Sequence, residues 1–107
     1  RSEGRAVYVD FTARWCATCQ LNKRVYQDPE LAALLLERNV ALLKADWTQY
    51  DERITSVLKN EFNKAAVPVT VFYRPGERRG EVLPDILTVQ NVTEALTSGS
   101  GDALVSR

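Results

Sequence analysis

The stretch VDFTARWCATC, residues 9–19, decides the fold, because its short apolar segment leads directly into two cysteines. Residues 5–12 are mostly apolar and β-branched, which predicts a buried strand. Residues 17–26 suit a helix. A Cys-x-x-Cys pair between a strand and a helix is a redox signature, since unpaired N–H groups at the start of a helix stabilise a thiolate.

The two cysteines therefore predict thiol–disulfide exchange that needs no cofactor. Cys16 is the expected attacking thiol, because the helix start should lower its pKa below the free value of about 8.5. Cys19 lies one turn further on and can attack a mixed disulfide formed at Cys16, so the pair can pass two electrons. A passive disulfide and half of an intermolecular metal site are the alternatives. The chain has no His, so a zinc site would lack its usual ligands and no metal is expected.

The composition is that of one ordinary globular domain. A chain of 107 residues can close a single hydrophobic core. Its 14 basic residues balance 14 acidic ones, so neither a nucleic acid nor a membrane surface is an expected partner. The longest apolar runs fall far short of the roughly 20 residues that span a bilayer. We therefore expect a monomeric domain over residues 1–98 and a flexible Gly/Ser-containing tail over 99–107.

Helices and strands are expected to alternate along the rest of the chain. Asp28 and Pro29 predict the capped start of a helix that runs to about Arg38. Residues 48–51 resemble a capping box before the next helix, and Asn91 predicts the cap of a last short helix. The remaining elements are a buried strand at 40–45, a strand at 67–73 and a strand at 81–87 that forms a hairpin with it. This order predicts an α/β fold with a central mixed sheet, helices on both faces and a central strand that ends at the cysteines.

Two motifs resemble those of the thioredoxin superfamily. Residues 9–19 are similar to its active-site stretch, and VPVT, residues 67–70, is similar to its cis-proline loop. The resemblance extends over about nine tenths of the chain, up to the last helix. With ADWT at residues 45–48, the pattern most resembles the C-terminal periplasmic domain of DsbD-type thiol:disulfide interchange proteins. It implies a thioredoxin fold that lacks the family's first strand and helix, because the chain starts almost at the central strand.

The resemblance implies roles for four residues near the cysteines. Asp10 would be a buried acid beneath Cys19 with a raised pKa, relaying that thiol's proton; the alternative is a strand-end residue that reaches water. A cis Val67–Pro68 bond would leave the Val67 backbone free to pair with an extended substrate; alternatively, Pro68 only starts an edge strand. Trp15 would shield the site and dock partners, unless it is only a core aromatic.

The sequence leaves the place of Trp47 open and argues against a relay group at Lys23. Trp47 follows a strand and fits either the core or its rim. Some DsbD-type domains carry an acidic residue one turn into the active-site helix, and this chain has Lys23 at the corresponding position. A second proton-relay group is therefore not expected there.

The resemblance implies a protein-disulfide reductase in the periplasm. Electrons would come from a membrane reductant, the membrane domain of its own parent chain, and would pass to protein disulfide partners. The same membrane domain would tether this domain to the inner membrane. The dipeptide Ala17-Thr18 contains neither proline nor histidine, which favours a reducing or intermediate potential over an extreme one. A free thioredoxin-like reductase is one alternative. A non-catalytic thioredoxin-like module for binding or for carrying Cu(I) is another, although the chain offers no His or Met ligand.

Overall fold

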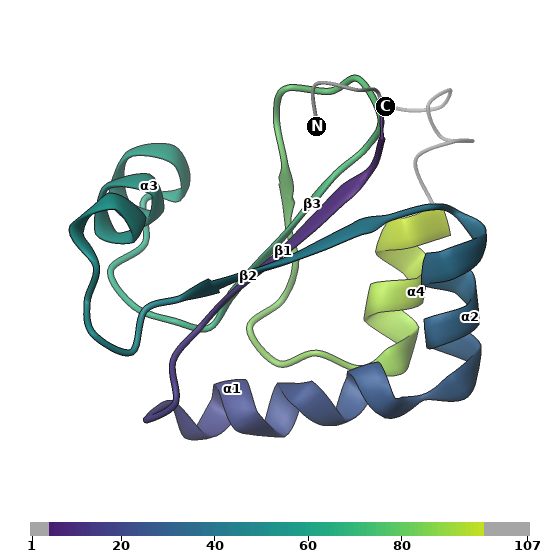
Figure 1. The fold of residues 1–107 in the computed structure, drawn as a ribbon, viewed down its shortest axis with the longest axis horizontal. Coiled ribbons are helices and arrows are strands. Elements are labelled where there is room, and N and C mark those ends of the chain that lie inside the picture. The colour runs from purple at the N-terminus through teal and green to yellow at the C-terminus, as the bar shows by residue number, and fades with distance from the viewer. Residues whose placement is uncertain (1–4, 98–107) are drawn as a thin grey trace.

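The fold alternates helices and strands in the predicted order (Figure 1). A computed structural model describes residues 5–97, so the expected tail at 99–107 lies outside the described residues. The elements are β1 (Val7–Thr12), α1 (Ala17–Asn22), the 3₁₀ helix η1 (Lys23–Gln27), α2 (Pro29–Glu37), β2 (Ala41–Asp46), α3 (Glu52–Phe62), β3 (Val69–Tyr73), β4 (Glu81–Val82) and α4 (Val89–Thr97). The predicted helix over 17–26 is thus α1 continued by η1. Within the described residues, no helix has the length and apolar character needed to cross a membrane.

The four described strands form one mixed sheet in the order β2-β1-β3-β4. β1 runs parallel to β2 and antiparallel to β3. β4 pairs with β3 as the second strand of the expected hairpin, but it ends at Val82, whereas the sequence predicted a strand over 81–87. β1 therefore has a partner on each side, which confirms that the strand leading to the cysteines is central. In Figure 1, α2 and α4 lie side by side on one side of the sheet and α3 lies on the other.

The side chains of β1 contribute to two hydrophobic cores, one on each face of the sheet, because successive side chains of a strand point to opposite faces. Tyr8 packs with residues of α2 and α4 on one face. Val7 and Phe11 pack with residues of α3 on the other. Every residue of β3 is buried, as expected for an inner strand covered on both faces. The sheet thus holds the end of β1 rigidly at its centre.

The strand predicted as buried at 40–45 is instead largely exposed. β2 occupies the expected segment, but Leu42 is 56% exposed and Leu43 is 55% exposed. These neighbours point to opposite faces, so both faces of the strand are open. β2 is the outermost strand of the described sheet and is bordered by β1 alone. An apolar run predicts a strand but does not distinguish a central position from an edge.

The helix starts agree with the sequence at one of three predicted caps. Asp28 accepts a hydrogen bond from the Leu31 N–H at 3.0 Å, which confirms the cap of α2. The predicted capping box at 48–51 is wrong: Asp51 itself caps α3 by accepting N–H bonds from Arg53 and Ile54. Thr48 does not cap α3, because its hydroxyl donates to the Asp46 carboxylate and accepts from the Arg14 N–H.

The cap of the last helix is Thr88, three positions before the predicted Asn91. α4 begins at Val89, and the Thr88 hydroxyl accepts from the Asn91 N–H at 3.0 Å. The Asn91 side-chain oxygen accepts from the Thr88 N–H at 3.0 Å in return. Asn91 is therefore the third residue of the helix in a reciprocal cap, and Thr88 is the residue that precedes the helix.

Candidate functional site

The two cysteines lie where β1 gives way to α1. They form a disulfide, with Cys16 7% exposed and Cys19 3% exposed. Cys16 occupies the position before the first residue of α1, and its Sγ accepts a hydrogen bond from the Cys19 N–H at 3.1 Å. After reduction, the same N–H can stabilise a thiolate on Cys16. The slightly more exposed cysteine is thus also the one whose sulfur receives a backbone N–H that can stabilise a negative charge.

The proline loop lies beside the cysteines, although Val67 is 51 positions away from Cys16 in the sequence. Sγ of Cys16 lies 3.8 Å from the carbonyl oxygen of Val67. Val67 also packs against a small buried cluster of Ala13 and the two cysteines. The Val67–Pro68 peptide bond is cis, as expected. The two motifs that the sequence singled out therefore meet at one site.

Asp10 lies in β1, two residues before its last residue, on the face that also carries Tyr8. Burial raises the pKa of this carboxyl above its ordinary value, while the charges of Lys23 and Lys44 act in the opposite direction. Lys44 is the register partner of Asp10 on β2. The raised pKa agrees in direction with the prediction for Asp10. Lys23, at the position that was not expected to supply a relay acid, is instead a cation near this carboxyl.

A pair formed by the buried Tyr8 and the half-buried Tyr26 lies near Asp10, and sequence reasoning missed it. The hydroxyls of Tyr8 and Tyr26 lie 3.0 Å apart, and their rings meet edge to face at 5.9 Å. Burial raises the pKa of Tyr8 to about 12, and burial also raises the pKa of Tyr26. The Asp10 charge contributes in the same direction to both tyrosine pKa values. Asp10 therefore shares its surroundings with two protonated phenols.

Trp15 lies beside Cys16 and is 49% exposed, so it is not a core aromatic. Its indole Nε1 donates to the Thr48 carbonyl at 3.0 Å. Its ring stacks on Tyr50 and also contacts Trp47. Trp47 itself is buried in the hydrophobic core that β1 shares with α3. Sequence reasoning missed Tyr50 because residues 48–51 resembled a helix cap.

Asn22, at the end of α1, is a buried polar residue that the sequence analysis did not single out. Its Nδ2 donates to the Asp85 carbonyl at 2.9 Å, and its Oδ1 accepts from the Leu87 N–H at 3.0 Å. Both partners lie in the segment between β4 and α4. The helix that carries the cysteines is thereby fastened to a segment more than sixty residues away. The signal that could have revealed it is an Asn in a helix, where its own propensity is poor.

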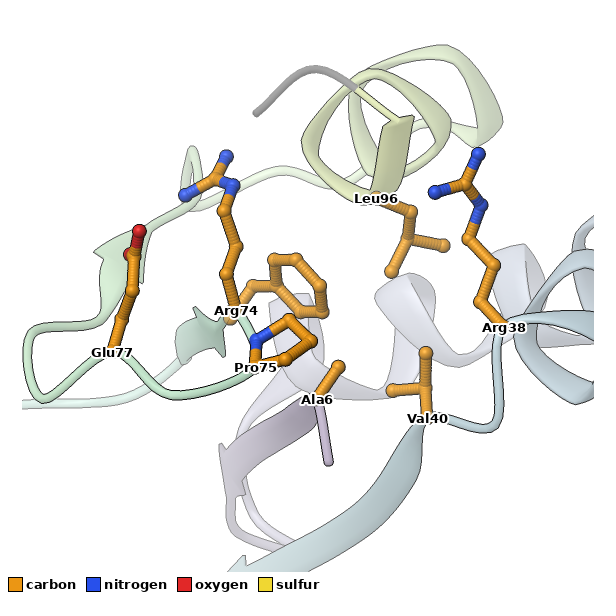
Figure 2. A pocket seen from close by; sticks show the side chains of 8 residues that line it. Ala6, Arg38, Val40, Arg74, Pro75, Glu77 and Leu96 are labelled. Carbon is orange, nitrogen blue, oxygen red and sulfur yellow. The ribbon is translucent and has the colours of Figure 1, made fainter. Parts of the chain in front are cut away.

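A separate hollow of about 390 Å³ lies at the opposite end of the sheet (Figure 2). Its apolar lining comes from Ala6, Val40, Phe72 and Leu96, and two arginine side chains flank it in Figure 2. One of them, Arg74, pairs with Glu81. None of the cysteines or their neighbours described above lines this hollow, so it is not the exchange site.

Comparison with known proteins places this geometry in context. A family model described as thioredoxin-like matches residues 1–75. The oxidised C-terminal domain of Neisseria meningitidis DsbD is similar at 23% identity, covering 84% of this chain and 76% of its own, with a TM-score of 0.69. Chloroplastic thioredoxin z is similar at 20% identity, with 94% of this chain and 82% of its own covered and a TM-score of 0.69. A thioredoxin from Thermus thermophilus is similar at 21% identity, with 99% of this chain and 87% of its own covered and a TM-score of 0.67. A sequence search of curated proteins finds no match. The structural likenesses show a shared fold.

Proposed function

Because the chain belongs to the thioredoxin-like family, we propose that it is a thiol–disulfide oxidoreductase that reduces disulfides of partner proteins through Cys16 and Cys19. The observation that carries the proposal is the disulfide at the junction of β1 and α1, with a backbone N–H directed at Cys16 Sγ. The family and the fold are consistent with this chemistry. The direction of electron flow and the partners are the parts that need experiment.

The first step is attack of the Cys16 thiolate on one sulfur of a partner disulfide. An S–S bond forms between Cys16 and the partner, the partner's own S–S bond breaks, and its other sulfur leaves as a thiolate that takes up a proton. The Cys19 N–H at 3.1 Å from Cys16 Sγ favours the thiolate that starts the step. The Val67 backbone, beside the same sulfur, is placed to pair with an extended partner segment.

The second step is attack of Cys19 on Cys16 Sγ. The Cys19 thiol first loses its proton; its sulfur then forms the Cys16–Cys19 bond, and the partner leaves as a second thiolate. The partner has gained two electrons and this domain has lost two. We propose that Asp10 takes up this proton, which is the role that the resemblance implies. Burial raises the pKa of its carboxyl, so its carboxylate accepts a proton more readily than that of an ordinary aspartate. Lys23 and Lys44 limit that rise.

Periplasmic reduction is the setting that we propose for this chemistry. The resemblance of residues 9–19, 45–48 and 67–70 to DsbD-type domains is the reason why we propose electron supply by the membrane part of a parent chain, without a flavin enzyme and without a bound cofactor. The dipeptide Ala17-Thr18 places no histidine between the cysteines, so the reduced form lacks one stabiliser found in strong oxidants. Equilibration with glutathione should give a potential roughly between −270 and −200 mV. A value near −120 mV, like that of an oxidase, would overturn the reductase assignment.

Insulin reduction with dithiothreitol as the electron source tests the assignment. The wild-type domain should speed insulin precipitation, and Cys16→Ser should abolish the effect. Cys19→Ser should instead accumulate a mixed disulfide with its partner, visible on a non-reducing gel. Iodoacetamide should label Cys16 before Cys19 in the reduced protein. Equal activity of Cys16→Ser and wild type would refute the mechanism, and tight Cu(I) binding without insulin reduction would favour a metal carrier.

A further inference from the structure

Three aromatic rings form a cluster beside the cysteines. Trp15 stacks on Tyr50 with centroids 5.5 Å apart and planes inclined by 20°. Trp47 meets Tyr50 edge-on at 4.9 Å and lies 6.1 Å from Trp15. Trp15 is 49% exposed and Tyr50 is 58% exposed, whereas Trp47 is only 8% exposed. Trp15 and Tyr50 therefore present an aromatic platform to solvent, and Trp47 supports it from below.

Hydrogen bonds hold both tryptophan rings of this cluster and the backbone of Tyr50 in place. The Trp47 indole donates to the Thr55 hydroxyl at 2.8 Å, which fastens the supporting ring to α3. The Trp15 indole donates to the Thr48 carbonyl at 3.0 Å, and the Tyr50 N–H donates to the Trp47 carbonyl at 3.0 Å. A surface whose rings are already fixed loses little side-chain freedom when a partner binds.

Folding alone does not explain Tyr50. Its φ of +55° lies in the left-handed region, which is unfavourable for a bulky side chain and is accepted readily by glycine or asparagine. The turn thus places a large aromatic ring, mostly exposed, in a strained backbone conformation. Exposed apolar surface and local strain both concentrate where proteins bind partners.

We infer that the aromatic platform is a docking surface that selects an apolar or aromatic side chain next to the disulfide of a protein partner. The inference rests on the proposed function and adds a substrate preference to it. Trp15 directly precedes Cys16, so a residue flanking the attacked disulfide comes within reach of the platform. Tyrosine and tryptophan are the residues that most often dominate binding energy in such contacts.

The charges around the platform favour an apolar partner over a cationic one. The Asp46 carboxylate accepts hydrogen bonds from the Thr48 backbone and hydroxyl, and Asp51 caps α3 and pairs with Arg53. The nearest cation in the chain, Arg14, adjoins Trp15. Asp46 keeps its negative charge, but Arg14 lies close enough to act on this carboxyl, and Arg53 pairs with Asp51. Each of these carboxylates thus has a cation of the chain beside it, so neither of them singles out a cationic partner side chain.

Kinetics with two cyclic disulfide peptides test the inference. The peptides differ only in carrying Phe or Ser beside one cysteine, and bis(2-hydroxyethyl) disulfide measures the exchange chemistry without a flanking residue. Reduced wild-type domain should reduce the Phe peptide about tenfold faster than the Ser peptide. Tyr50→Asn, which suits the left-handed turn, should bring this ratio to within about twofold. Tyr50→Phe should keep the ratio, as should Leu36→Ala, which removes a residue on α2 that is 83% exposed.

Several results would overturn the inference. They are a wild-type ratio near one, a ratio that survives Tyr50→Asn, or equal slowing of all three substrates by Tyr50→Asn. If wild type reduces none of the substrates, the proposed function fails instead. The platform is then judged by titrating the double variant Cys16→Ser/Cys19→Ser with both peptides and following tryptophan fluorescence; equal affinities would refute it.

Discussion

Asn22 offers a sharp test of how the cysteine-bearing helix is held. Asn22→Ala removes two hydrogen bonds, to the Asp85 carbonyl and from the Leu87 N–H. A neutral hydrogen bond contributes about 1 kcal/mol to stability, and a buried donor left without a partner costs about 1–3 kcal/mol. Asp85 is exposed, so its carbonyl can turn to water, whereas Leu87 is buried and its N–H is stranded. We therefore expect a loss of about 2–4 kcal/mol in the free energy of unfolding.

Urea unfolding at 25 °C, followed by circular dichroism, measures this loss. Asn60→Ala is the matched control, because Asn60 is also helical but makes an exposed bond to the Ser56 hydroxyl at 3.0 Å. That control should change stability by less than about 0.5 kcal/mol. If Asn22→Ala lost no more than Asn60→Ala, the two bonds to the β4–α4 segment would not hold the helix, and the reasoning would be refuted.

Three further substitutions test other parts of the structure. Burial raises the pKa of Asp10, so its contribution to stability is complete below the ordinary pKa of 3.8 and is lost as the pH rises through the raised native pKa. In chemical denaturation, the stability of Asp10→Asn relative to wild type should therefore grow with pH across that window. A difference in stability that does not depend on pH would contradict the burial of Asp10. Thr12→Val should raise the free energy of unfolding by about 1 kcal/mol in the same assay, since the buried Thr12 hydroxyl has no hydrogen-bond partner among the described residues, and a loss would show that it does have one. Leu58→Ala should cost about 2–5 kcal/mol and Leu36→Ala less than about 0.5, because the first side chain is buried and the second is exposed; similar costs would place the core elsewhere.

Local patterns were sufficient to predict the elements around the cysteines. The apolar β-branched run before Cys16 and the Asp28-Pro29 pair each specify their structure through neighbours in the sequence. The burial of β2 was not predictable in this way. Leu42 and Leu43 look the same in a central strand as in an edge strand, because the difference lies in which strands pair beside them.

The parts of the site that were missed depend on contacts between distant segments. Asn22 bonds to residues 63 and 65 positions away. An Asn within a helix indicates that its side chain is engaged, but the neighbouring sequence does not identify these partners. Thr48 has the residue type of a helix cap, but its hydroxyl accepts from the Arg14 N–H, 34 positions away, at 2.9 Å. Tyr50 was hidden by the same mistaken cap. When the hydrogen-bond partner of a polar side chain lies far away in the sequence, only the folded structure identifies that partner.

The strand pairing explains why the separate motifs gather at one edge of the sheet. Thr12 and Asp46, the last residues of the parallel strands β1 and β2, are register partners. Phe11 pairs with Val69, the first residue of the antiparallel strand β3. The segments that follow β1 and β2 and the one that precedes β3 must therefore emerge together, and these carry the cysteines, the aromatic platform and the proline loop. The hollow of Figure 2 lies where the same strands begin or end at the opposite edge, so changes to its lining can alter stability without reaching the exchange site.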